Sequence, residues 1–144
     1  MAGAIISVDV TDKEVRQLLK KLTDKIGNPT EALHNIGARM LSSVQENFEE
    51  EGRPEKWVPR KDKKPHPILR SDSNNLFGSI HPTVQGDEVK VGTLVEYAAI
   101  HQFGGETGKG YKTVIPARPY LMLQDEDNAA IIELLEDYIT EVTK

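Results

Sequence analysis

The strongest constraint on the fold is a long amphipathic stretch that begins at Pro29 and stops before Gly52. Its apolar side chains recur every three or four residues, which is the spacing of one face of an α-helix. They are Leu33, Ile36, Gly37, Met40, Leu41, Val44 and Phe48. A helix of roughly 23 residues is about 34 Å long, whereas a compact chain of this size has a radius of gyration of about 15 Å. We therefore expect this helix to cross the whole body as its scaffold.

Local start signals accompany this helix and two others. Asn28 is expected to cap the long helix, and Glu31 closes a capping box. Thr11 and Glu14 form the same arrangement before an earlier helix, and Asp125 is expected to cap a final one. The apolar stripes of these two helices are Val15, Leu18, Leu19 and Leu22, and Ile131, Leu134, Leu135, Tyr138, Ile139 and Val142.

Short β-prone segments predict a small antiparallel sheet. Strands are expected at 4–10, 80–84, 89–94 and 111–115, helical turns at 76–77 and 97–103, and a flexible loop at 104–110. The fold class is therefore α+β, with a small antiparallel sheet flanked by the long helix and the C-terminal amphipathic helix. A chain of 144 residues fits a single domain over residues 1–144.

The net charge of −5 conceals two oppositely charged regions. Residues 53–70 hold seven basic and two acidic residues, about +5, and residues 125–144 hold seven acidic and one basic residue, about −6. Such a chain can attract copies of itself head to tail, as a ring requires. Two solvated surfaces that never meet would explain the same pattern equally well.

Residues 52–72 form a long, proline-rich, basic segment with a single aromatic residue, Trp57. Long loops without internal structure are uncommon in compact domains and are usually functional or disordered. We expect Trp57 to pin part of the segment to the body, because an exposed indole would leave much apolar area in water. The part between Arg60 and His66 is expected to be mobile in an isolated subunit.

No pattern of residues predicts an enzyme, a metal site or a cofactor. Lys109 follows Gly108 but lacks the earlier glycine and the following Ser or Thr of a phosphate-binding loop. The four histidines are scattered, and no nucleophile turn of the G-x-S-x-G type occurs. A pair of catalytic carboxylates stays open, because acidic residues are plentiful. The absence of cysteine, of a basic leader and of a long apolar run favours a cytoplasmic product that is not in the membrane.

Nucleic-acid binding is the main alternative that the residues themselves suggest. The basic segment could contact phosphates, and Trp57 could stack on a base. Against this interpretation, the whole chain is acidic. The residues of this segment that could contact a partner of either kind are Arg53, Lys56, Trp57, Arg60, Lys61, Lys63 and Lys64.

Two sequence boxes resemble a known family. The first reads YAAIHQFGG at residues 97–105 and the second reads IPARPYL at residues 115–121, with a Gly- and Lys-rich stretch between them. The pair resembles the phage virion morphogenesis proteins, which include Mu G-like and P2 S-like tail-completion proteins. The similarity covers most of residues 29–142. Tyr120 stands where the family usually has Phe.

The resemblance implies a structural, non-catalytic role in completing the tail or joining it to the head. It implies a ring of identical subunits, commonly sixfold, in contact with neck, connector, tail tube or sheath proteins and near the DNA in the lumen. It also implies assembly in the bacterial cytoplasm and a final location in the virion.

The boxes also have a physical interpretation. Ile100 and Phe103 are expected in the core, Gly104 and Gly105 allow a backbone path that other residues cannot follow, and Arg118 could pair with a carboxylate of its own subunit or of a neighbour. The residues that either hold the fold or contact a partner are Tyr97, His101, Gln102, Gly104, Gly105, Arg118 and Pro119. The polar stretch 106–110 is expected to contact a partner.

Overall fold

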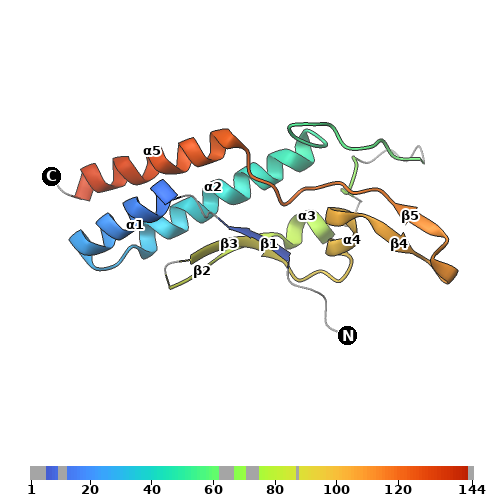
Figure 1. Ribbon diagram of the computed structural model, residues 1–144, viewed down its shortest axis with the longest axis horizontal. Coiled ribbons are helices and arrows are strands. Elements are labelled where there is room, and N and C mark those ends of the chain that lie inside the picture. Colours follow the sequence, from blue (N-terminus) through green and yellow to red (C-terminus); the bar gives the residue numbers. More distant parts are fainter. Residues whose placement is uncertain (1–5, 10–12, 62–66, 71–74, 87, 143–144) are drawn as a thin grey trace.

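The computed structural model describes residues 6–9, 13–61, 67–70, 75–86 and 88–142 (Figure 1). In chain order the elements are β1 (Ile6–Asp9), α1 (Lys13–Ile26), α2 (Thr30–Glu49), α3 (Asn75–Ser79), β2 (His81–Gln85), β3 (Glu88–Thr93), α4 (Ala98–Phe103), β4 (Gly105–Thr107), the 3₁₀ turn η1 (Lys109–Tyr111), β5 (Thr113–Ile115) and α5 (Asp125–Val142). Helices and antiparallel strands combine as the α+β class predicts.

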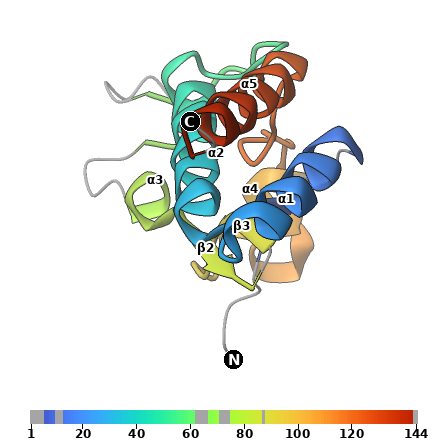
Figure 2. The same ribbon diagram turned by 90° about the vertical axis from the view of Figure 1, so that its left-hand side faces the viewer.

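The long helix α2 is the central element. On one side it packs against β2 and β3, and on the other against α5, which also contacts α1 (Figures 1 and 2). Its predicted apolar stripe lies in or against the core, as do the stripe of α1 and that of α5 as far as Ile139. The fully buried apolar side chains of these helices include Val15, Leu22, Leu33, Ile36, Met40, Val44, Phe48, Ile131 and Leu135. The prediction of a scaffold helix is therefore confirmed.

The sheet has the order β1-β3-β2, and both pairings are antiparallel. Val89, Val91 and Thr93 alternate along β3 and are buried, which places one face of the sheet against α2. Gly37 of α2 makes this close packing feasible, because a Cβ there would lie only 3.0 Å from the Cβ of Pro82. The missing side chain on α2 therefore lets β2 approach the helix.

The molecule is long, and its two ends differ (Figure 1). The C-terminus of α5 and the α1–α2 connection lie at one end. The opposite end is formed by α4 and by the antiparallel pair β4–β5, in which Gly105 faces Ile115 and Thr107 faces Thr113. We call the part made of α4, β4, η1 and β5 the hairpin end.

Several helix boundaries differ from the predicted ones by a few residues. Asn28 Oδ1 accepts a hydrogen bond from the Thr30 N–H (3.0 Å), but α2 runs from Thr30 to Glu49 and its N-cap residue is Pro29, so the predicted cap at Asn28 lies one residue too early. For α5 the predicted cap is wrong. The carboxylate of Asp127, not that of Asp125, reaches back to accept the Gln124 N–H (2.7 Å). The predicted capping residue Thr11 lies outside the described residues.

Two predictions about the hairpin end are wrong. Residues 104–110 were expected to form a flexible loop, but Gly105–Thr107 pair with β5 and residues 109–111 form a 3₁₀ turn. Phe103 was expected in the core, yet its side chain is 70% exposed. Ala98 occupies the buried face of α4, and Phe103 lies five residues later, about 140° around the helix axis. The ring therefore faces outward.

Candidate assembly site

Gln102 joins the two boxes at the hairpin end. Its Oε1 accepts hydrogen bonds from the N–H groups of Tyr120 (3.0 Å) and Leu121 (2.9 Å). Its Nε2 donates to the carbonyl oxygen of Leu121 (3.2 Å). Beside it, the N–H of Arg118 donates to the carbonyl oxygen of His101 (2.8 Å). The two boxes are therefore one structural unit.

Arg118 fastens this unit to the segment that follows α2. Its Nε and one Nη donate to the carbonyl oxygen of Val58 (3.0 and 2.8 Å), and the same Nη reaches that of Pro59 (3.3 Å). Within the described residues, its hydrogen-bond partners are carbonyls and not carboxylates. The described residues therefore show no carboxylate partner for Arg118, and the predicted pair with a carboxylate stays a prediction.

Trp57 pins the same segment from the other side. Its side chain is 6% exposed, packs edge-on against Phe48 with 5.7 Å between ring centroids, and donates from Nε1 to the carbonyl oxygen of Pro119 (3.2 Å). This confirms the predicted anchoring role. A tight turn after α2 brings the indole there. In that turn Gly52 has a φ of +114°, and a Cβ added there would lie 2.5 Å from the backbone nitrogen of Trp57.

Gly104 permits a close approach between the boxes. Its φ is +74°, and an added Cβ would lie 2.8 Å from the nitrogen of Ala117. At Gly105 an added Cβ would meet nothing closer than 3.7 Å. Gly104 is therefore the glycine that the packing requires, whereas Gly105, with a φ of +153°, is required by backbone conformation alone.

Tyr97 and His101 lie on the outer side of α4. Their rings meet edge to face with 5.8 Å between centroids, and Tyr97 is 43% exposed. The Nδ1 atom of His101 is buried and has no hydrogen-bond partner among the described residues. Burial, followed by the charge of Arg118, lowers the pKa of His101. His101 is therefore expected to be neutral near pH 7.

Tyr120 contacts the buried side of α4. The side chain is fully buried, its hydroxyl donates to the carbonyl oxygen of Ala98 (2.8 Å), and its ring lies 5.2 Å from that of Phe48. Burial, with a smaller effect of Tyr97, raises the pKa of the phenol. The hydroxyl that distinguishes this chain from the usual Phe therefore has a satisfied place in the core.

Arg53 belongs to a polar network inside the fold. Its Nε donates to Asn47 Oδ1 (2.8 Å), and one Nη donates to the carbonyl oxygen and the hydroxyl of Ser43 (both 2.8 Å). The other Nη pairs with Glu46 (3.0 Å) and with Glu126 (3.4 Å). Because these partners hold its guanidinium, Arg53 has a structural role in the subunit.

The same network ties α2 to α5 and to the second box. Ser43 donates to Asp127, which also accepts from Arg39 (2.9 Å). The Nδ2 of Asn47 donates to the carbonyl oxygens of Tyr120 (2.7 Å) and Met122 (2.9 Å). Sequence reasoning missed Ser43, Asn47 and Asp127. The available signal was that Ser43 and Asn47 are spaced four residues apart beside the apolar stripe.

The remaining basic residues of the segment differ in their surroundings. The Nζ of Lys56 contacts the carboxylate of Glu50 (3.2 Å) and donates to the carbonyl oxygen of Glu50. Lys61 is exposed, and Arg60 is partly buried. Lys63 and Lys64 lie outside the described residues. In the described part of this segment Lys56 and Lys61 are exposed basic residues, and nucleic-acid binding stays a prediction.

Large apolar side chains are exposed around the hairpin end. They are Val58 (53%), Leu94 (61%), Tyr97 (43%), Phe103 (70%) and Val114 (64%). Single exposed apolar residues are ordinary, but several at one end of a molecule typically mark a contact surface. Gln102 and Arg118 of the boxes bond to backbone groups and hold this end in place, so the exposed apolar side chains stand on a rigid base.

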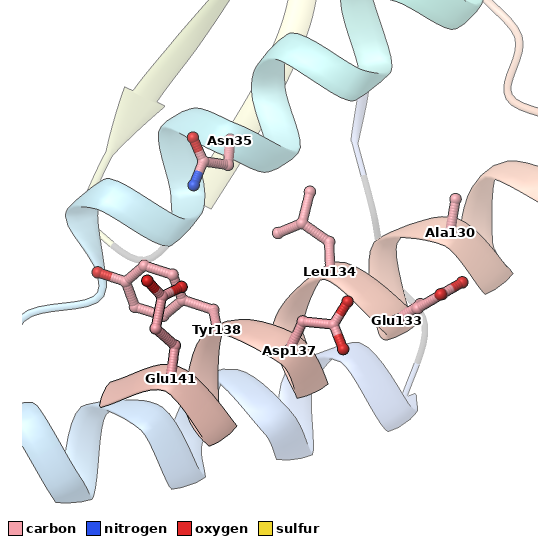
Figure 3. Close-up of a pocket in the computed structure, with 7 residues that line it drawn as sticks. All are labelled: Asn35, Ala130, Glu133, Leu134, Asp137, Tyr138 and Glu141. Carbon is pink, nitrogen blue, oxygen red and sulfur yellow. The ribbon is translucent and has the colours of Figure 1, made fainter. Parts of the chain in front are cut away.

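A shallow groove lies between α2 and α5, along the stretch of α5 from Ala130 to Glu141 (Figure 3). Its volume is about 390 Å³, and it is lined by Asn35, Ala130, Glu133, Leu134, Asp137, Tyr138 and Glu141. We call it the α5 groove. The Tyr138 hydroxyl donates to Glu31 (2.9 Å) across it. Its charged groups are all acidic.

Two features, a metal-binding cluster and a membrane-spanning helix, are absent from the part of the chain that the structure describes. That part contains no group of three or more His, Cys, Asp or Glu side chains arranged to hold a metal ion. None of its helices is long and apolar enough to cross a membrane.

Comparison with known proteins extends the similarity over almost the whole chain. The profile of the phage virion morphogenesis family matches residues 10–140. The chain is 38% identical over 135 residues to the Mu-like prophage FluMu G protein 2 of Haemophilus influenzae, an alignment that covers 93% of this chain and 96% of that protein. No solved structure matches significantly.

Proposed function

The chain belongs to the phage virion morphogenesis family, and on that premise we propose that it is a structural subunit that completes the tail or joins it to the head. It acts as a ring of identical copies, sixfold as the resemblance implies. Its other partners are the neck, connector, tail tube or sheath proteins. It is assembled in the host cytoplasm and stays at the neck or tail end of the virion.

The observation that carries this proposal is how the boxes use their polar side chains. Gln102, Arg118 and Trp57 all bond to backbone carbonyls or N–H groups, so they hold the hairpin end in place. A catalytic site instead needs polar groups that converge on a substrate. The arrangement supports a non-catalytic protein whose rigid body presents apolar side chains, led by Phe103 and Val114, to other virion proteins.

Deletion of the gene from the phage that encodes it tests the proposal. We expect infectious particles to be lost and electron microscopy to show heads and tails that are unjoined or tails that are unfinished. A wild-type copy supplied in trans should restore normal particles. Normal joining and normal titre without the protein would overturn the proposal.

Point variants separate the contact surface from the fold. Phe103→Asp should restore few particles in the same complementation assay while its thermal unfolding stays close to wild type, because the ring is already exposed to solvent. Lys21→Asp, an exposed position on α1, is the matched control and should complement fully.

A further inference from the structure

Three acidic residues along the α5 groove lie close enough on the helix to repel one another in an isolated subunit. Glu133, Asp137 and Glu141 follow one another at intervals of four residues, so they are neighbours on one face of the helix. Like charges at this spacing repel. None of the three forms an ion pair with a cation of the described chain. A cationic partner would remove this repulsion.

The floor of the groove is apolar. Leu134 and Ala130 are partly buried and lie between the acidic side chains and α2 (Figure 3). A volume of about 390 Å³ is enough for a few side chains of a partner. The groove therefore suits a ligand that combines apolar side chains with positive charge at their edge.

The hairpin end of the same chain has this combination. Phe103 at the end of α4 (70%) and Val114 on β5 (64%) are the two most exposed large apolar side chains of the described part of the molecule. Lys109 and Lys112, in and just after η1, are exposed and form no ion pair within the described residues. A pair of three-residue strands is marginal on its own and gains stability when its face is covered.

The two surfaces lie at opposite ends of the molecule (Figure 1). A contact between unlike surfaces is heterologous, so each copy can bind one neighbour at each end, and the chain of copies closes into a ring when the rotation allows. We propose that the hairpin end of one copy docks in the α5 groove of the next. In this contact Phe103 and Val114 face Leu134 and Ala130. Lys109 and Lys112 face the acidic rim. The inference rests on the proposed function and names the surfaces that build the ring.

Charge reversal at each end tests the contact. Lys109→Glu with Lys112→Glu, or Asp137→Lys with Glu141→Lys, should each weaken self-association at least tenfold by sedimentation velocity. The variant that carries all four substitutions, called the fourfold variant, should associate again, because the attraction is re-formed with the signs exchanged. Lys20→Glu with Lys21→Glu, on exposed positions of α1, is the matched control and should associate like wild type. Circular dichroism must show that all variants fold.

Cross-linking gives the direction of the contact. The chain has no cysteine, so Val114→Cys and Ala130→Cys introduce single thiols at the two surfaces. A short bismaleimide should link the two variants when they are mixed, and it should link neither variant to itself.

The outcomes separate this inference from the function on which it rests. Wild-type protein that stays monomeric at high concentration, a fourfold reversal that does not restore association, or cross-links within one variant would overturn the docking contact. Such a result, together with lost particles on gene deletion, would leave the virion role standing. Restored association by the fourfold variant together with normal particles on deletion would overturn the virion role and leave the contact.

Discussion

At the scale of single residues, Asp127 shows how a buried charge can hold a fold together. Its side chain is 1% exposed, yet its oxygens accept from Ser43, Arg39 and the Gln124 N–H. Burial alone would raise the pKa of Asp127, but these hydrogen bonds and the charge of Arg39 outweigh burial and lower it. The residue therefore stays ionised and joins the start of α5 to α2.

Asp127→Asn should lower the free energy of unfolding by about 3 kcal/mol, because it leaves buried donors without an anionic acceptor. Urea unfolding at neutral pH measures the loss. Asp125→Asn, two residues away on an exposed position, should cost less than about 0.5 kcal/mol. Equal effects for the two variants would contradict the role assigned to Asp127.

The same carboxylate makes a signed prediction for acid. Folding lowers the pKa of Asp127 below its ordinary value of 3.8, so the unfolded chain takes up the proton first. The stability that the ionised group contributes is therefore present above pH 3.8 and is lost as the pH falls through the lower, folded pKa. The difference in stability between wild type and Asp127→Asn should shrink as the pH drops below 3.8.

His101 also has a lowered pKa, but here the charged form is the one that folding disfavours. Below its ordinary pKa of 6.5 the unfolded chain binds the proton before the folded chain does. Stability should fall as the pH drops from 6.5 toward the folded value, and His101→Gln should lack this slope. Arg118→Met should raise the pKa of His101 only part of the way, because burial is the larger cause. Nuclear magnetic resonance titration of the imidazole measures both.

At the scale of elements, the junction between α4 and β4 depends on one glycine. Gly104→Ala places a Cβ against Ala117 at a positive φ, and should lower the free energy of unfolding by about 2 kcal/mol or more. Gly78→Ala in α3, where an added Cβ meets nothing within 4 Å, should be neutral or slightly stabilising. Thermal unfolding compares the two. A Gly104→Ala protein as stable as wild type would mean that the boxes can separate without cost.

The elements also show which parts of a fold a sequence can predict. The helix α2 was predictable because its apolar stripe repeats over twenty residues, so many positions report the same period. The strand β5 falls within the predicted strand at 111–115, but its partner β4 was not predicted, because β4 has only three residues and lies among glycines. The contact of Ser43 with Asp127 joins residues 84 apart, and no local pattern could have indicated it. Gln102 and Arg118 bond to backbone groups of distant residues. Because every residue has such groups, the sequence could not indicate these partners.

At the scale of the whole molecule, the acidic face of α5 and the exposed Lys109 and Lys112 of the hairpin end lie toward opposite ends of the long axis (Figure 1). If copies associate through these ends, salt should weaken association, because the screening length falls from about 10 Å at 0.1 M to about 3 Å at 1 M. Sedimentation velocity across this range measures the effect. The fourfold charge-reversed variant should show the same salt dependence as wild type, and association that strengthens with salt would point to apolar contacts alone.

The position of Trp57 gives the protein a built-in optical reporter. It is the only tryptophan of the chain, and its indole lies where the end of α2, the segment after it and the second box meet. Emission from the native protein should therefore be blue-shifted. Any binding event that lifts this segment from the body should shift the emission to longer wavelengths, and such an event can be followed in real time without a dye.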